Sequence, residues 1–295
     1  MCARTGVWNP IGQTLTGTAD NDSFGEALDL SADGRIMAVA APLADDATGR
    51  FSVGRVQIYS INSNTNKWQQ LGQDLFGRAA SDSFGQGLAL SDDGLTLVVT
   101  SEDAGYAMVF EYDSNSNAWV QVGNVMERES ADDKFGSSVD ISACGCIVVI
   151  GGSFPGLRMF RYTSGVGEWV QVGATIFGED DSLGDAVAIS DDGNIAAAGG
   201  YRNDGAFGTE SGHVRVFQFD GTDWNQLGQD VDGEASFDFS GGSVALSGDG
   251  VVLAAGVKLN KGGGESAGHV RVYRFNDGVN SWKKGRARYK WPHRE

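Results

Sequence analysis

The 295-residue sequence has few prolines (4), few cysteines (3) and no long apolar run. No stretch approaches the roughly 18 apolar residues of a transmembrane helix, and residues 1–10 lack the apolar centre of a signal peptide. We therefore expect no membrane insertion, and a soluble chain that is not exported. The second inference lapses if the chain is a fragment of a longer protein, so the compartment stays undetermined.

The three cysteines, Cys2, Cys144 and Cys146, do not make a disulfide framework. Cys144 and Cys146 stand two residues apart on or beside a strand, so their side chains should point the same way, which does not favour a bridge. The sequence contains no Cys/His cluster at zinc spacing, no glycine-rich phosphate loop before a helix and no nucleophile-elbow motif. We expect no metal, no cofactor and no catalytic residue.

Positive charge is scarce outside one segment. The formal net charge is −17, and residues 283–294 hold six of the 22 lysines and arginines. Residues 1–282 therefore carry 16 basic and 38 acidic side chains, a net charge of −22. Such a body repels phosphates, which disfavours nucleic acid and anionic membranes as partners. We expect a cationic or polar partner, and a mobile basic tail at 283–295.

Glycine is abundant, with 44 residues, and one phrase recurs five times. Each copy has an aspartate, a Phe-Gly pair or its variant, a short apolar segment and a Ser-x-x-Gly turn. The copies begin at Asp22, Asp82, Asp133, Asp181 and Asp238. A tryptophan also recurs every 50 to 60 residues, at Trp8, Trp68, Trp119, Trp169, Trp224 and Trp282. This period, with short alternating segments, is typical of β-propellers.

Each repeat holds four strand-like segments and none of helical period. They are the segment after Phe-Gly, the apolar run after the turn, an alternating segment such as residues 54–59, and the tryptophan segment. The sequence thus predicts an all-β fold, a propeller of five four-stranded repeats in one domain at 1–282. The repeats are expected at 22–76, 82–127, 133–178, 181–231 and 238–282.

A sixth segment of the tryptophan type stands at residues 7–15, before the first repeat. The last one, at 281–289, is a poor copy. Because open sheet edges are a liability, we expect residues 7–15 to pair with residues 268–275 and close the ring.

The order of Phe-Gly, the Asp-Gly turn, "AVAAP" at 38–42 and "GRVQIY" at 54–59 resembles FG-GAP repeats, as in the propellers of integrin α-subunits. The resemblance covers residues 22 to about 275. It implies a propeller that binds other molecules, often outside the cell and often with calcium in the loop between the first two strands. Here that loop offers at most two carboxylates, and none in "SACG", so we expect no calcium. The family usually builds seven blades, which leaves a truncated product open.

Two groups of polar residues are candidates for binding. The first is the repeated aspartate, for which a hydrogen-bonded turn is favoured over an acidic ring around the channel mouth. Its members are Asp22, Asp82, Asp133, Asp181 and Asp238. The second group lies in the three long loops at 43–53, 201–211 and 257–267, where functional variation is expected. Its members are Asp45, Asp46, Arg202, Asp204 and Lys261.

Asp29 and Asp140 are expected to reach channel water or a donor, and His213 and His269 to be edge residues. The favoured function is a non-catalytic binding or scaffold module that presents an acidic loop face to a protein partner. The alternative is a lectin with one carbohydrate site per repeat. A glycoside hydrolase ranks third, because catalysis needs different residues on different repeats, whereas these repeats are nearly alike.

Overall fold

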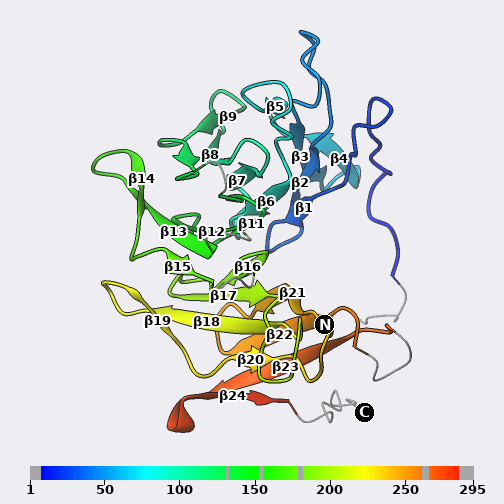
Figure 1. Ribbon diagram of the computed structural model, residues 1–295. Coiled ribbons are helices and arrows are strands. Elements are labelled where there is room, and N and C mark those ends of the chain that lie inside the picture. The colour runs from blue at the N-terminus through cyan, green and yellow to red at the C-terminus, as the bar shows by residue number, and fades with distance from the viewer. Residues whose placement is uncertain (1–7, 131–132, 153–155, 179–181, 261–265, 286–295) are drawn as a thin grey trace, which may run out of the picture.

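The computed structural model describes residues 8–130, 133–152, 156–178, 182–260 and 266–285. They form five antiparallel sheets that follow one another in chain order (Figure 1). The helical structure in these residues is a single 3-10 turn, Asp277–Val279. No helix in the described ranges is long and apolar enough to cross a membrane. The predicted all-β fold of antiparallel sheets with four main strands is confirmed, and four of the five sheets add a short fifth strand.

The chain runs through each sheet from its inner strand outwards, and the connection between the second and third strands is long in sheets 1, 4 and 5. Sheet 1 contains β1 (Leu28–Leu30), β2 (Ile36–Ala41), β3 (Arg55–Asn62), β4 (Lys67–Gln70) and β5 (Leu75–Phe76). Sheet 2 contains β6 (Gly87–Leu90), β7 (Thr96–Ser101), β8 (Tyr106–Asp113), β9 (Ala118–Gln121) and β10 (Met126–Glu127). Sheet 3 contains β11 (Ser138–Ile141), β12 (Ile147–Gly151), β13 (Gly156–Thr163), β14 (Glu168–Gln171) and β15 (Ile176–Phe177).

The last two sheets repeat this order. Sheet 4 contains β16 (Ala186–Ile189), β17 (Ile195–Gly200), β18 (His213–Phe219), β19 (Trp224–Gln226) and β20 (Val231–Asp232). Sheet 5 contains β21 (Ser240–Leu246), β22 (Val252–Val257), β23 (His269–Asn276) and β24 (Ser281–Lys284). The short fifth strand of sheets 1 to 4 has no counterpart in the described part of sheet 5.

The core consists of four apolar layers, each between two consecutive sheets. We call the face of a sheet that packs on the preceding sheet its first face, and the face that packs on the following sheet its second face. Between sheets 1 and 2, for example, Ala38 and Ile58 lie in one cluster with Leu90. Residues alternate between the two faces along each strand, so strands covered on both sides are buried throughout, as in β7 and β12.

A second contact joins consecutive sheets at their outer edge, and we call it the tryptophan clamp. The indole Nε1 of Trp119 in β9 donates to the carbonyl oxygen of Leu71, just after β4 of the preceding sheet, at 2.9 Å. Gln73 donates to the Trp119 carbonyl and accepts from the Trp119 N–H, at 2.7 and 3.0 Å. The indoles of Trp169, Trp224 and Trp282 are held in the same way by Val122, Val172 and Leu227.

The predicted ring closure by residues 7–15 is wrong. Residue 7 lies outside the described ranges, and residues 8–15 form no strand. They clamp Trp68 instead, because its indole donates to Ile11 O at 3.1 Å and Gln13 bonds the Trp68 backbone. The outer strand of sheet 5 is β24, which pairs with β23. Lys283 and Lys284 thus belong to a strand rather than to a tail, and residues 286–295 lie outside the described ranges.

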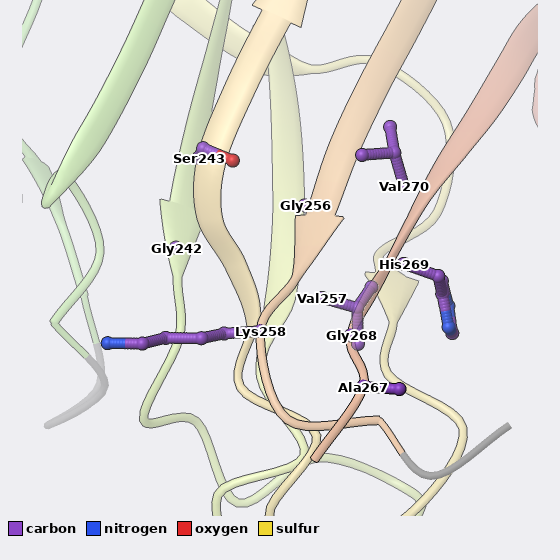
Figure 2. A pocket seen from close by; sticks show the side chains of 9 residues that line it. All are labelled: Gly242, Ser243, Gly256, Val257, Lys258, Ala267, Gly268, His269 and Val270. Atoms are coloured by element: carbon purple, nitrogen blue, oxygen red, sulfur yellow. The ribbon is translucent and has the colours of Figure 1, made fainter. Parts of the chain in front are cut away.

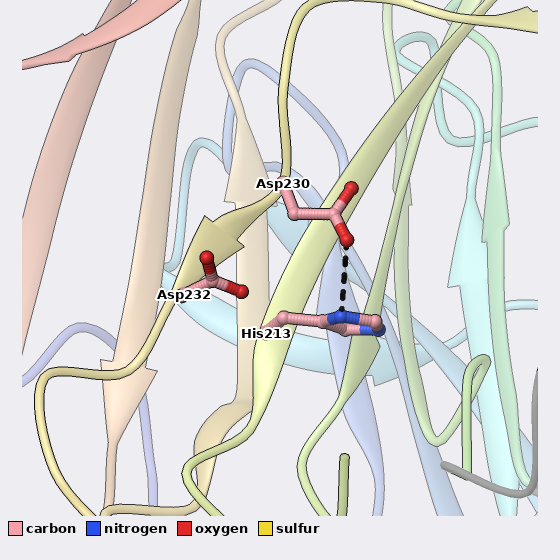
Figure 3. A group of neighbouring side chains, drawn as sticks. All are labelled: His213, Asp230 and Asp232. Carbon is pink, nitrogen blue, oxygen red and sulfur yellow. Dashed lines mark ion pairs between the residues drawn. The ribbon is translucent and has the colours of Figure 1, made fainter. Parts of the chain in front are cut away.

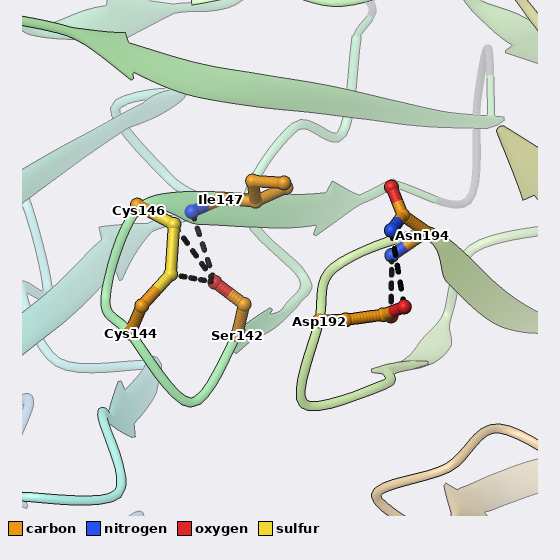
Figure 4. The surroundings of a disulfide bond; sticks show 6 residues. All are labelled: Ser142, Cys144, Cys146, Ile147, Asp192 and Asn194. Carbon is orange, nitrogen blue, oxygen red and sulfur yellow. Dashed lines mark hydrogen bonds between the residues drawn. A yellow bond between two sulfur atoms is a disulfide. The ribbon is translucent and has the colours of Figure 1, made fainter. Parts of the chain in front are cut away.

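The expectation for Cys144 and Cys146 is also wrong, because the two residues form a disulfide (Figure 4). Cys144 lies in the turn between β11 and β12, and Gly145 has a φ of +69°, so the two cysteines do not follow one straight strand. Four other turns have an aspartate in the place of Cys144, such as Asp192, which accepts from the N–H of Asn194 two residues on. The disulfide joins the same two positions covalently.

Candidate functional site

The repeated aspartates hold loops rather than line an opening. Asp22, Asp82, Asp133 and Asp238 are all buried, and Asp181 lies outside the described ranges. Asp82 accepts the backbone N–H groups of Arg78 and Ala79 at 2.8 and 2.9 Å and the Tyr106 hydroxyl at 2.8 Å. Asp133 and Asp238 likewise accept backbone N–H groups of the preceding turn, and the Asp22 carboxylate accepts from Arg55. A binding role for these five residues stays a prediction, and the site below is built from other side chains.

The candidates in the long loops separate into two kinds. Asp45, Asp46 and Asp204 accept hydrogen bonds from the N–H groups of their own loops, those of Ser52, Thr48 and Glu210. Lys261 lies outside the described ranges. Arg202 is exposed, and its guanidinium carbon stands 5.2 Å from the centre of the Tyr201 ring. Of these predicted residues, Arg202 is the one that reaches a hollow.

That hollow lies at the junction of sheets 4 and 5 and measures about 480 Å³. Loops that leave or enter four strands build it, so its residues come from both sheets. It is lined by Asp185, Tyr201, Arg202, Phe239, Gly242, Lys258 and Leu259. The rings of Tyr201 and Phe239 stand 6.1 Å apart and form an aromatic wall. One carboxylate, two cationic side chains and two rings thus share one concave surface.

The matching hollow at the junction of sheets 1 and 2 has the opposite charge. It measures about 350 Å³ and is lined by Ser23, Glu26, Pro42, Leu43, Ser83, Gln86, Glu102, Asp103 and Ser137. Glu26 holds the place of Asp185 in the repeat, and Leu43 that of Arg202. Three carboxylates and no cation line it, so an anion would be repelled here and attracted at the junction of sheets 4 and 5.

Sequence reasoning missed Asp185, Tyr201, Phe239 and Lys258 as members of one site. A signal was present, because Tyr201 and Arg202 replace the Pro-Leu of the first repeat, and Phe239 stands one place before the usual Phe-Gly phenylalanine. These departures from the repeat were visible. Their convergence on one hollow requires the packing of sheet 5 on sheet 4.

Asp29 and Asp140 lie on inner strands, where they bond the next sheet. Asp140 accepts the N–H of Ile189 in β16 and of Ile141, each at 2.8 Å. Asp29 accepts that of Leu90 in β6 at 2.7 Å. Burial raises the pKa of both carboxyls, that of Asp140 to about 6, although these bonds act in the other direction. Asp29 and Asp140 were expected to reach either channel water or a hydrogen-bond donor, and their donors are backbone N–H groups of the neighbouring sheet.

His213, Asp230 and Asp232 form the group in the described ranges whose ligand atoms come close enough to hold a metal (Figure 3). The same Asp230 oxygen stands 3.5 Å from His213 Nδ1 and 3.2 Å from Arg215 Nε, and Gln226 donates to the other oxygen. The bond from His213 and the charge of Arg215 hold the Asp230 pKa below its usual range. Asp74 occupies the same place in sheet 1 and is bonded by Gln57 and Gln70. We interpret the group as a recurring hydrogen-bond network.

No family model matches the chain, and no curated protein matches it. Solved structures do. A candidate 6-phosphogluconolactonase from Bacteroides fragilis is 15% identical with a TM-score of 0.57, over 88% of this chain and 69% of that one. The periplasmic gluconolactonase of Pseudomonas aeruginosa is 20% identical with a TM-score of 0.56, over 87% and 70% of the two chains. A protein of unknown function from Desulfotomaculum acetoxidans is 12% identical with a TM-score of 0.60, over 89% and 69%.

Identities this low show the fold alone, which is all-β and propeller-like. The names of these structures contradict the functional expectation. A non-catalytic module was expected, whereas two of these three structures carry the names of lactonases, which are enzymes. The expectation that the chain is not an enzyme is therefore withdrawn.

Proposed function

We propose that this chain is a hydrolase of a small cyclic ester, a lactone, that carries negative charge. The hollow between sheets 4 and 5 is its proposed active site. The observation that carries the proposal is that Asp185, Arg202 and Lys258 share this hollow with the Tyr201 and Phe239 rings. The names of the two gluconolactonase structures support the choice of substrate class.

Each group in the hollow has a part in lactone hydrolysis. Asp185 takes a proton from water as the water oxygen adds to the ester carbonyl carbon. One of the two cations, Arg202 or Lys258, stabilises the negative charge that develops on the carbonyl oxygen, and the other binds the anionic substituent. The ring oxygen then leaves as the carbonyl re-forms and takes the proton from Asp185, which opens the lactone to a hydroxy acid and restores the Asp185 carboxylate. The Tyr201 and Phe239 rings cover the apolar face of the substrate ring.

The five sheets are, in this proposal, blades of a propeller made of FG-GAP-like repeats. The recurring Phe-Gly turn and the period of 50 to 60 residues support it. The repeats build the frame, and the active site arises where sheets 4 and 5 depart from the repeat. Catalysis was disfavoured because the repeats are nearly alike. In this proposal the likeness belongs to the frame, whereas the residues of the hollow differ from one repeat to the next.

The test is the rate of lactone opening above the rate without protein, with 6-phosphogluconolactone and glucono-δ-lactone as substrates. We expect Asp185→Asn to lower kcat by about 100-fold or more, because it removes the general base. Arg202→Gln should raise KM for the phosphorylated lactone more than for the neutral one. Glu26→Gln, at the matching place between sheets 1 and 2, is the control and should leave both constants unchanged. A wild-type rate equal to the blank, or equal losses in Asp185→Asn and Glu26→Gln, would contradict the proposal.

A further inference from the structure

The two ends of the row of sheets carry opposite halves of the interface that joins consecutive sheets. On second faces, Val109 in sheet 2 and Val216 in sheet 4 are at most 1% exposed. Their counterpart in sheet 5, Val272, is 49% exposed, and Val270 beside it is 69% exposed. This second face therefore lacks the cover that every other second face has.

Sheet 1 shows the reverse on its first face. Leu88 and Leu90 of sheet 2 are 8% and 7% exposed, because they pack on sheet 1. Leu28 and Leu30, which hold the same places in β1, are 58% and 46% exposed. No contact comparable to those between successive inner strands joins β21 to β1 in the described ranges.

Each internal interface also contains a seat for the Phe-Gly turn of the following sheet. In sheet 3 the seat is the row Ser138–Gly151–Leu157, and Ser138 donates to the carbonyl oxygen of Gly184 at 2.7 Å. A Cβ on Gly151 would stand 2.0 Å from that oxygen, so at this interface the turn fits against glycine, whereas sheets 1 and 2 have Ala40 and Thr100 at the same place. In sheet 4 a Cβ on Gly199 would stand 1.9 Å from the carbonyl oxygen of Gly241.

The corresponding row of sheet 5 is Ser243–Gly256–Val270. It has the serine and the glycine of the seat, and it lines a hollow of about 440 Å³ (Figure 2). The corresponding turn of sheet 1 is Phe24–Gly25. A Cβ on Gly25 would meet nothing within 4 Å, whereas one on Gly85 would stand 2.8 Å from the Ala40 Cβ. Sheet 5 thus has a seat that no described turn fills, and sheet 1 has a turn that no described seat receives.

We propose that the chain binds a second copy of itself head to tail. Phe24–Gly25 of one copy enters the Ser243–Gly256–Val270 seat of the other, and Leu28 and Leu30 cover Val272. This contact would repeat the four interfaces between consecutive sheets. One chain carries both the seat, in sheet 5, and the turn, in sheet 1, so a second copy provides the missing half at either end. Ile11 and Gln13 already clamp Trp68, so the docking copy needs to provide only the second face of its sheet 5.

A head-to-tail contact uses two different surfaces, and this makes a sharp test available. Leu30→Asp damages the turn side and leaves the seat side intact, and Val272→Asp does the reverse. Each variant alone should associate at least about 30-fold more weakly than wild type, because a buried unpaired carboxylate is costly. An equimolar mixture should form a complex of two chains and no larger one, because each variant retains the half that the other lacks.

Sedimentation velocity over a range of concentrations measures these masses against the 31.1 kDa single chain. Val166→Asp is the control, because Val166 is 66% exposed in the turn between β13 and β14, and it should associate like wild type. Circular dichroism establishes that all variants fold. Three results would each overturn the proposal: wild type that stays a single chain at all concentrations, a mixture that forms no two-chain complex, or an equal loss in Val166→Asp. Capture of a different protein by the wild-type faces, without self-association, would do the same.

Discussion

Carboxylates on the inner strands show how a single residue joins two sheets. The second face of an inner strand carries alanine in sheets 2, 4 and 5 and aspartate in sheets 1 and 3. Asp140 uses one oxygen for the N–H next to it and the other for the N–H of Ile189 across the interface. The aspartate provides a hydrogen bond between inner strands that alanine cannot make, and its proton is correspondingly harder to remove because the site is buried.

The stability of the protein should therefore depend on pH through Asp140. Its pKa is about 6 in the folded chain against 3.8 for the ordinary group, so the folded state binds the proton more tightly than the unfolded state. This contribution to the free energy of unfolding is complete below pH 3.8 and is lost as the pH rises through about 6. Urea unfolding of wild type and Asp140→Asn at pH 4, 5, 6 and 7 should show the wild-type advantage falling over this range.

The control for this prediction is Asp113→Asn. Asp113 lies at an exposed turn, where hydrogen bonds from Ser116 and Asn115 lower its pKa. Its contribution is lost only as the pH falls towards and below 3.8, so the difference from wild type should stay constant between pH 5 and 7. Parallel stability curves for wild type and Asp140→Asn would show that burial does not control this carboxyl.

At this scale the sequence was a partial guide. It showed that Asp29 and Asp140 needed water or a donor, but it could not show which N–H group of the next sheet stands opposite. For Cys144 and Cys146 it failed, because the rule for residues two apart assumes extended backbone. Gly145, with a φ of +69°, bends the chain between them.

At the scale of elements, the tryptophan clamp ties each outer strand to the turn that precedes it in the neighbouring sheet. We expect Gln73→Ala to lower the free energy of unfolding by about 2 to 3 kcal/mol, because two hydrogen bonds to Trp119 are lost in a half-buried site. Gln121→Ala is the matched control. Gln121 bonds only Gly123 and is exposed, so its loss should cost below about 0.5 kcal/mol. Chemical denaturation measures both, and equal costs would contradict a structural role for the clamp.

The disulfide turn allows a second prediction at this scale. A bridge across so short a loop restricts the unfolded chain little, so reduction should cost only about 1.5 kcal/mol. Cys144→Asp combined with Cys146→Ser restores the aspartate turn of the other sheets and should recover most of this loss. Cys144→Ser with Cys146→Ser should not. Thermal unfolding with and without reductant distinguishes them, and equal melting temperatures for the two double variants would contradict the exchange of disulfide for aspartate.

The strands themselves were predictable, because alternation and the Ser-x-x-Gly turn recur in all five copies. The closing strand was not, although the signal was in the sequence. Ile11-Gly12-Gln13 matches Leu71-Gly72-Gln73, the segment that follows a tryptophan strand rather than the strand itself. The prediction aligned all of residues 7–15 with a tryptophan strand and the turn after it. Only the part that matches the turn, residues 11–13, contacts Trp68.

At the scale of the whole molecule, each sheet packs only on its neighbours within the described part of the chain, as in other repeat proteins. There sheets 1 and 5 have one neighbour each, so their amides should exchange with solvent faster than those of sheet 3. Leu253→Ala removes a buried side chain from the layer between sheets 4 and 5. In dilute protein it should speed exchange in sheets 4 and 5 and leave sheets 1 and 2 unchanged. Hydrogen exchange with mass spectrometry tests this, and uniform acceleration in all five sheets would contradict it.

The candidate site belongs to this scale as well. No single repeat contains it, and a reading of the repeats one by one favours binding by equivalent residues on each sheet. Asp185 and Lys258 meet only because sheet 5 packs on sheet 4. Asp185 and Lys258 occupy different positions in their repeats, so comparison of the repeats does not pair them. The pair becomes apparent only in the packed structure.

The clamp also fixes where this architecture could be cut and rejoined in the laboratory. A graft that keeps β4 but omits the turn after it would remove Leu71 and Gln73 from Trp119 and leave its indole without an acceptor. A module running from residue 78 to residue 128 instead contains β6 to β10 of one sheet together with the turn at 122–124 that clamps Trp169, and the turn that clamps its own Trp119 comes from whichever module precedes it. Splice junctions placed there would make modules interchangeable, so arrays of other lengths could be assembled from this one chain without redesign of their contacts.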